Sequence, residues 1–168
     1  DAGRPHGLPT HIGLHAGPML LGNVGAGDHY EYRAVGDTVN TATRVEGLNK
    51  LLGTRVLATE SVVENAGEVR SRPVGRFVLA GKSRPLSVYQ LLCPERDAAL
   101  IRAGYLERYR RAFAAFQAGD WCTASRLFAV LCRETPQDGP SRYYARLSEE
   151  FRQRPPSTWE GVIELEAK

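Results

Sequence analysis

Two kinds of apolar spacing divide the chain. Between residues 11 and 92 apolar and polar positions alternate over short runs, which favours β-strands, whereas residues 97–151 show only the spacing of amphipathic helices. The pattern therefore predicts an α+β part followed by an all-α part. Strands are expected over residues 11–16, 19–24, 30–35, 55–58, 74–79 and 86–92, and helices over 37–52 and 60–66. Residues 1–9 and 25–28 are rich in glycine or proline and are expected to form a loop and a turn.

The longest helix of the α+β part is expected from Asp37 to Leu52, with Asp37 as its N-cap and Gly53 just beyond its end. Asn40 and Arg44 lie four residues apart and so share one face of this helix. A neutral amide beside a permanent planar cation could hold a sugar oxygen and stabilise a phosphate. The same spacing also occurs on ordinary solvated helix faces. The apolar stripe on the helix consists of Val39, Ala42, Val45, Leu48 and Leu52.

Aromatic residues mark the helices of the second part. Gly119-Asp120 and Thr135-Pro136 interrupt the pattern, which leaves three helices that we expect to pack on the α+β part. The Gly-Asp-Trp turn resembles the inter-helix turn of a tetratricopeptide unit, but one unit does not make an open solenoid. Residues 158–168 form a tail whose apolar residues could add a strand. We predict boundaries at 1–94, 95–153 and 154–168. The two stripes comprise Tyr105, Tyr109, Phe113 and Phe116, then Trp121, Ala124, Phe128 and Leu131.

Composition narrows the function classes. Hydrophobic residues make up 42% and charged residues 24% of the 168, as in ordinary globular proteins. A net charge of +3 is too small to indicate a nucleic-acid partner. The three cysteines do not form a disulfide framework, and His11 and His15 lack the further ligands of a zinc site, so we assign no metal site. Because the chain starts with Asp1 and its one methionine is Met19, we expect a fragment of a longer protein.

Five motifs follow one another in the α+β part: His11–Pro18 (HIGLHAGP), Leu21–Gly25 (LGNVG), Tyr30–Tyr32 (YEY), Val35–Arg44 (VGDTVNTATR) and Val45–Lys50 (VEGLNK). In this order they resemble the catalytic domain of class III adenylate and guanylate cyclases. The resemblance covers about residues 10–92, the C-terminal half of that domain. It implies a partial ferredoxin-like sandwich, a mostly antiparallel sheet with helices on one face. The motifs look most like bacterial adenylate cyclases with a sensor and membrane helices upstream, which implies a cytoplasmic domain of an inner-membrane protein.

The resemblance also implies an activity, a lyase reaction of signal transduction. ATP, or GTP, would be converted to a 3′,5′-cyclic monophosphate and pyrophosphate. Asn40 would orient the ribose and Arg44 would stabilise charge on the transferring phosphate. The family works as a dimer with shared sites, so the partner would be a second cyclase subunit. Two aspartates of the other half-domain would hold Mg²⁺ or Mn²⁺; none can be assigned here, and the fragment alone should be inactive.

Three basic residues are further candidates for substrate binding. The family places a triphosphate-binding lysine directly before the glycine of the loop at residues 81–85, where this chain has Ala80. Lys82 or Arg84 could take over that role, or both could be solvated loop cations. Arg33 occupies a position where the family commonly has Asp, Thr or Ser to read the purine. Since arginine only donates hydrogen bonds, base selectivity does not carry over, and Arg33 could instead be structural.

Two other functions remain open at this stage. The protein could be a nucleotide-binding regulatory domain whose other half lacks the metal-binding aspartates. Alternatively, the helical part could be a protein-interaction module. An exposed apolar groove lined by Tyr105, Tyr109 and Trp121 would favour the interaction module, and burial of these residues would oppose it.

Overall fold

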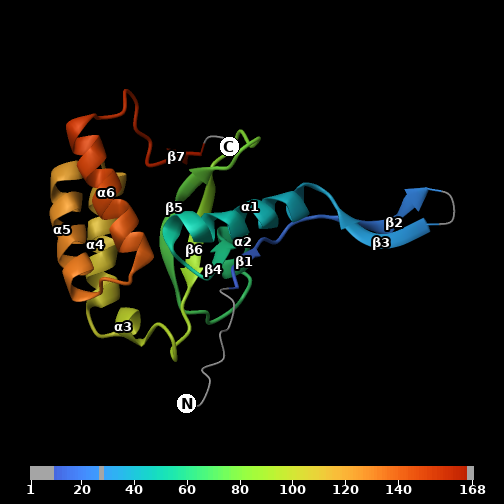
Figure 1. Cartoon of the computed structure of the whole chain (residues 1–168), viewed down its shortest axis with the longest axis horizontal. Coiled ribbons are helices and arrows are strands. Elements are labelled where there is room, and N and C mark those ends of the chain that lie inside the picture. Colours follow the sequence, from blue (N-terminus) through green and yellow to red (C-terminus); the bar gives the residue numbers. More distant parts are fainter. Residues whose placement is uncertain (1–9, 27–28, 166–168) are drawn as a thin grey trace, which may run out of the picture.

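The computed structural model describes residues 10–26 and 29–165, so the expected loop at 1–9 and the tip of the turn at 25–28 lie outside the described residues. The expected α+β arrangement with an all-α extension is confirmed (Figure 1). The strands are β1 (Ile12–Leu14), β2 (Leu20–Ala26), β3 (His29–Val35), β4 (Val56–Thr59), β5 (Ser71–Val78), β6 (Leu86–Leu91) and β7 (Ile163–Glu164). The helices are α1 (Asp37–Leu52), α2 (Glu60–Val63), α3 (Ala98–Ile101), α4 (Tyr105–Gln117), α5 (Trp121–Glu134) and α6 (Gly139–Gln153).

Five strands form a central sheet in the order β1-β4-β6-β5-β7. The pairs β4–β6 and β5–β6 are antiparallel, whereas β1–β4 and β5–β7 are parallel, so the sheet is mixed. β7 comes from the C-terminal tail, and its pairing with β5 confirms the expected extra strand. The hairpin β5–β6 carries the loop on which Lys82 lies.

Helix α1 covers one face of the sheet, and its contact with β1 is unusually close. A Cβ atom on Gly13 would lie 2.2 Å from the backbone nitrogen of Glu46, so only glycine fits between strand and helix. The side-chain amide of Asn49 donates to the Ile12 carbonyl at 3.0 Å and ties the two elements together. Ile12 and Leu14 consequently point to the opposite face, where they are exposed.

The buried face of α1 differs in part from the expected stripe. Val45, Leu48 and Leu52 are buried as expected, but Val39 and Ala42 in the first turns are only half-buried. Thr38, Thr41 and Asn49 are buried instead. The hydroxyl of Thr41 donates to the Asp37 carbonyl, which satisfies its polar group within the helix.

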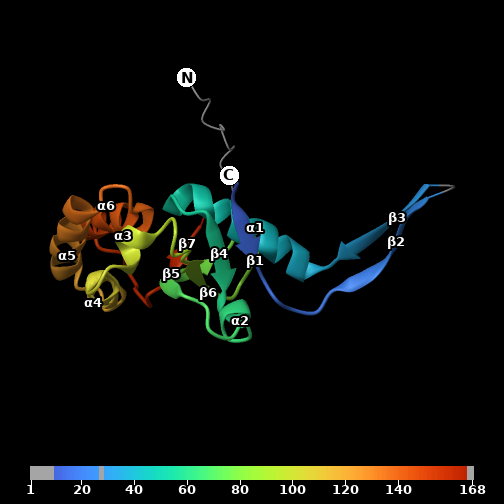
Figure 2. The same ribbon diagram turned by 90° about the horizontal axis from the view of Figure 1, so that it is seen from below.

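β2 and β3 form a separate two-stranded hairpin, which we call the arm (residues 20–26 and 29–35). It projects from the N-terminal end of α1, away from the sheet and the helices (Figures 1 and 2). Its large apolar side chains are exposed on both faces; Leu20 and Tyr32, for example, are 74% and 71% exposed. A two-stranded ribbon has no core of its own, so this surface is available for a partner.

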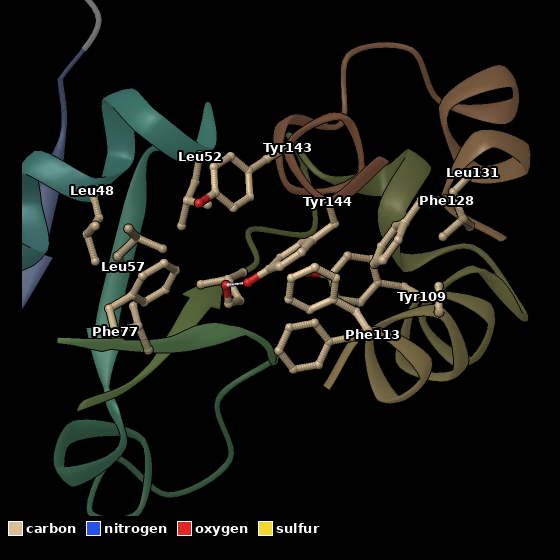
Figure 3. Packing of buried hydrophobic residues seen from close by; sticks show 14 of the residues in the cluster. Leu48, Leu52, Leu57, Phe77, Tyr109, Phe113, Phe128, Leu131, Tyr143 and Tyr144 are labelled. Carbon is tan, nitrogen blue, oxygen red and sulfur yellow. Dashed lines mark hydrogen bonds between the residues drawn. The ribbon is translucent and has the colours of Figure 1, made fainter. Parts of the chain in front are cut away.

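The helices α4, α5 and α6 pack side by side, and their aromatic residues share one continuous core with the sheet and α1 (Figure 3). Gly119 and the Asp120 cap, which accepts from the Thr123 amide at 3.0 Å, form the expected break between α4 and α5. The hydroxyl of Tyr144 donates to the Val74 carbonyl at 2.6 Å and thus joins α6 to β5. Tyr105 and Tyr109 are buried and Trp121 is half-buried, which opposes the interaction-module alternative.

Candidate active site

The first turns of α1 carry Asn40 and Arg44. The helix starts after Gly36, whose φ of 143° is accessible mainly to glycine. Asn40 is exposed and Arg44 half-buried. Within residues 10–26 and 29–165 neither side chain makes a hydrogen bond or an ion pair. Their donors and acceptors are therefore available to a ligand.

The expectation that Asp37 is the N-cap is wrong. Gly36 is the N-cap, Asp37 is the first helical residue, and no side chain caps the helix. The Asp37 carboxylate instead pairs with the ammonium group of Lys82. The hydrogen bond from Lys82 is the main reason that the pKa of Asp37 lies below its usual value. The charges of Lys82 and Arg44 act in the same direction.

The loop between β5 and β6 meets α1 at this point. Gly81 adopts a φ of 69°, and the Lys82 amide donates to the Leu79 carbonyl at 2.9 Å, so the loop turns tightly. A Cβ on Gly81 would lie 3.4 Å from a guanidinium nitrogen of Arg44. The loop therefore passes beside Arg44 at Gly81 and reaches Asp37 with Lys82, so Lys82 and Arg44 both lie along the N-terminal half of α1 although they are 38 positions apart in sequence. Two cations and an exposed amide along one half of a helix form a site suited to a polyphosphate.

The other two candidates lie differently. Arg84 is exposed on the same loop and, within the described ranges, makes no hydrogen bond or ion pair. Arg33 lies on the arm, where its Nε donates to Glu31 at 2.6 Å. No described contact joins Arg33 to Asn40, Arg44 or Lys82. The structure thus places Lys82 and Arg44 along the same half of α1 and leaves Arg33 in a local pair.

His15, at the end of β1, is a neighbour that the sequence did not assign to this site. Its Nδ1 is 2.9 Å from the Thr59 hydroxyl, and burial together with the charge of Lys82 lowers its pKa. His11 lies 3.9 Å from Glu46 instead, so the two histidines have different partners. Sequence separation hid His15, because β1 and the loop meet only in the fold. In the part of the chain that the structure describes, no three His, Cys, Asp or Glu side chains gather into a metal site.

Comparison with known proteins places these residues in a family. The adenylate and guanylate cyclase catalytic domain matches residues 3–92, which is 90 of the 168 residues. Adenylate cyclase 1 of Rhizobium meliloti is 41% identical over 108 residues, covering 62% of this chain and 16% of that protein. Adenylate cyclase of Anabaena cylindrica is 38% identical over 92 residues, covering 51% of this chain and 18% of that protein. The chain thus spans less than a fifth of these curated relatives.

The match to a Dictyostelium discoideum adenylate cyclase, described as terminal-differentiation specific, is longer. It is 29% identical over 142 residues, which is 82% of this chain and 7% of that protein. Among solved structures, the adenylyl cyclase CyaB from P. aeruginosa aligns with a TM-score of 0.43 and 27% identity, covering 51% of this chain and 43% of that one. None of the helices in the described ranges is both long and apolar enough to cross a bilayer.

Proposed function

Because the chain belongs to the adenylate and guanylate cyclase catalytic domain family, we propose that its full-length protein is an adenylate cyclase in signal transduction. The reaction converts ATP to 3′,5′-cyclic AMP and pyrophosphate, with the ribose 3′-oxygen attacking the α-phosphate. The observation that carries the proposal is that the β5–β6 loop, which carries Lys82, lies against the Arg44 guanidinium along the half of α1 that also bears Asn40. ATP is favoured over GTP because the named curated relatives are adenylate cyclases.

Each residue has a distinct role in this proposal. The Asn40 amide holds a ribose oxygen and thereby orients the 3′-oxygen, since positioning accounts for much of the catalysis of phosphoryl transfer. The Arg44 guanidinium stabilises charge that accumulates on the α-phosphate in the transition state. Lys82 binds the outer phosphates, because its ammonium already pairs with an anion beside α1, whereas Arg84 makes no ion pair within the described residues. Arg33 has no assigned role in binding the base, because no described contact joins it to Asn40, Arg44 or Lys82.

Mg²⁺ or Mn²⁺ would activate the 3′-oxygen and neutralise the phosphates when bound. The site residues of this chain do not fit such an ion: Arg44 and Lys82 are cations, Asn40 offers one neutral oxygen, and the Asp37 carboxylate is paired with Lys82. We therefore place the metal ligands in a half-domain outside this chain, and the fragment alone is inactive. The division into a cyclase part up to residue 94 and a helical part to residue 153 remains part of this proposal.

The proposal includes a homodimer with shared sites, in which, as in the cyclase family, one subunit provides the metal ligands and the other provides Asn40 and Arg44. The exposed apolar surface of the arm supports such an association, since patches of this kind mark interfaces. We place the dimer on the cytoplasmic side, where ATP is available. Attachment to an inner membrane through other segments of the protein belongs to the same proposal.

Complementation between inactive full-length variants tests both the activity and the shared site. Asn40→Ala is mixed with a variant that lacks a metal-binding aspartate of the other half-domain, under conditions where subunits exchange. Half of the dimers are then mixed, and each has one intact site, so about a quarter of the wild-type cyclic AMP production should return.

The matched control mixes Asn40→Ala with Arg44→Ala. Both changes lie on the same side of the site, so no mixed dimer contains an intact set and activity should stay absent. If the first mixture also stays inactive although subunits exchange, the shared site is wrong. If the wild-type protein forms no cyclic nucleotide, the regulatory-domain alternative replaces the proposed enzyme.

A further inference from the structure

The ammonium group that should bind phosphate is already paired with a carboxylate. Lys82 reaches from the β5–β6 loop to Asp37, the first residue of α1. The Lys82 side chain is only 17% exposed, whereas the Asp37 side chain is 79% exposed. The cation is therefore held in place by its surroundings, and the carboxylate is open to solvent and to an incoming anion.

Asp37 also lies within the positive field of the whole site. Besides Lys82, the charge of Arg44 lowers its pKa, so Asp37 is an anion at neutral pH. The N-terminal end of a helix adds further positive potential. The Asp37 carboxylate therefore lies where the proposed function places the outer phosphates, next to the Lys82 ammonium.

Resting on the proposed function, we propose that Asp37 competes with phosphate groups for Lys82 and so promotes the release of pyrophosphate. If the ion pair with Asp37 only held Lys82 in position, it would improve the affinity of the site for pyrophosphate by less than about fivefold, because Asp37 is exposed. By contrast, Lys82 draws a phosphate to the place that the Asp37 carboxylate occupies, so the phosphate must displace that carboxylate and stay within about 5 Å of its charge, which weakens binding by about tenfold. Without Lys82 a phosphate is not drawn so close to Asp37, and the penalty falls. Competition therefore outweighs any benefit of preorganisation.

The direct test is pyrophosphate binding to the full-length protein in the presence of Mg²⁺, measured by titration calorimetry, together with product inhibition of cyclic AMP formation. Asp37→Asn should lower the dissociation constant for pyrophosphate about five- to tenfold and lower the inhibitory concentration in parallel. Asp37→Ser is a second variant, which guards against a fault specific to asparagine. Both should fold, because the Asp37 side chain is exposed and caps nothing.

Glu46→Gln is the matched control. It removes one carboxylate from the same helix, but Glu46 lies near His11 and not near Lys82, so pyrophosphate affinity should change less than twofold. The effect of Asp37→Asn should also fall below twofold in a Lys82→Met background, because the contested cation is then gone.

Three results would overturn the inference. Unchanged or weaker pyrophosphate binding in both Asp37 variants would show that Asp37 only positions Lys82 or does nothing. If Asp37→Asn raised pyrophosphate affinity equally with and without Lys82, Asp37 would act by repelling pyrophosphate and not by competing for Lys82. A wild-type protein that makes no cyclic AMP and binds no pyrophosphate would instead overturn the proposed function, and this inference with it.

Discussion

Arg72 on the sheet and Arg44 on α1 have surroundings that differ in almost every respect. Arg72 on β5 is fully buried; it donates to Asp138 and Gln90 at 2.9 Å each, and its guanidinium lies 4.3 Å from the centre of the Tyr109 ring. Arg44 is half-buried and, among the described residues, makes no hydrogen bond or ion pair.

The difference separates a structural cation from one that is available for chemistry. A buried arginine must have its donors satisfied, and once they are, the pair fixes a single arrangement of the elements that carry it. Here those elements are β5 and the start of α6. At the same joint, a Cβ on Gly139 would lie 2.1 Å from the Leu52 carbonyl oxygen at the end of α1. The C-terminal end of α1 is therefore fixed by packing, which leaves its N-terminal end to present Asn40 and Arg44.

Breaking the buried pair should have the largest effect. Asp138→Ala leaves the Arg72 guanidinium buried without its anion, so the free energy of unfolding should fall by about 3–5 kcal/mol in a denaturant titration. Cyclic AMP production per folded molecule, assayed at low temperature, should change little, because Asp138 is remote from Asn40 and Arg44.

A double variant sharpens this expectation. Arg72→Met with Asp138→Leu removes both charges, so it should lose clearly less stability than Asp138→Ala alone. If Asp138→Ala is as stable as the wild type, the pair does not hold α6 to the sheet. If a stable Asp138→Ala protein loses its activity, the helical part is regulatory as well as structural.

The opposite result is expected at the other arginine. Arg44→Ala should lower turnover by at least about a hundredfold, which corresponds to about 2.7 kcal/mol of transition-state stabilisation, and should change substrate binding much less. The free energy of unfolding should change by less than about 0.5 kcal/mol, since Arg44 makes no hydrogen bond to any other described residue. Lys50→Ala on the exposed face of α1 is the control and should leave turnover unchanged. Near-normal turnover of Arg44→Ala would remove Arg44 from the mechanism.

The contrast also shows what sequence could and could not predict. Periodicity predicted α1, the β5–β6 hairpin and the aromatic helices, because their signals are local and repeat within a few residues. The sequence did not single out Arg72 or Asp138, which are 66 positions apart and meet only when α6 docks on β5. The pairing of Lys82 with Asp37 could not be predicted for the same reason. In the structure Asp37 makes this ion pair instead of acting as the expected N-cap.

A smaller effect is expected at the second link between α6 and the sheet. Val74 lies at a β-bulge between Pro73 and Gly75, where the register to β6 shifts, and its carbonyl accepts from the Tyr144 hydroxyl (Figure 3). Tyr144→Phe leaves this buried acceptor without its partner and should cost about 1–2 kcal/mol in a denaturant titration. Tyr143→Phe is the matched control, because the neighbouring hydroxyl makes no hydrogen bond in the described ranges; its cost should be below about 0.5 kcal/mol. Equal costs would show that the Tyr144–Val74 bond adds no stability of its own.

The smallest expected effect is the loss of folding stability as the pH falls. Burial alone would raise the pKa of Asp138, but the hydrogen bond and charge of Arg72, with hydrogen bonds from Ser141 and Tyr105, lower it on balance. A carboxyl whose pKa is lower in the folded state stabilises the fold above its unfolded-state value, near 4, and this contribution is lost as the pH falls through the folded-state value. Within that window the free energy of unfolding should drop by at most about 1.4 kcal/mol per pH unit from this group. Denaturant midpoints at pH 6, 4 and 3 should therefore show a steeper loss for the wild type than for Asp138→Ala, which lacks the carboxyl. Parallel curves would mean that Asp138 titrates alike in the folded and unfolded states, and that the buried pair adds no acid sensitivity.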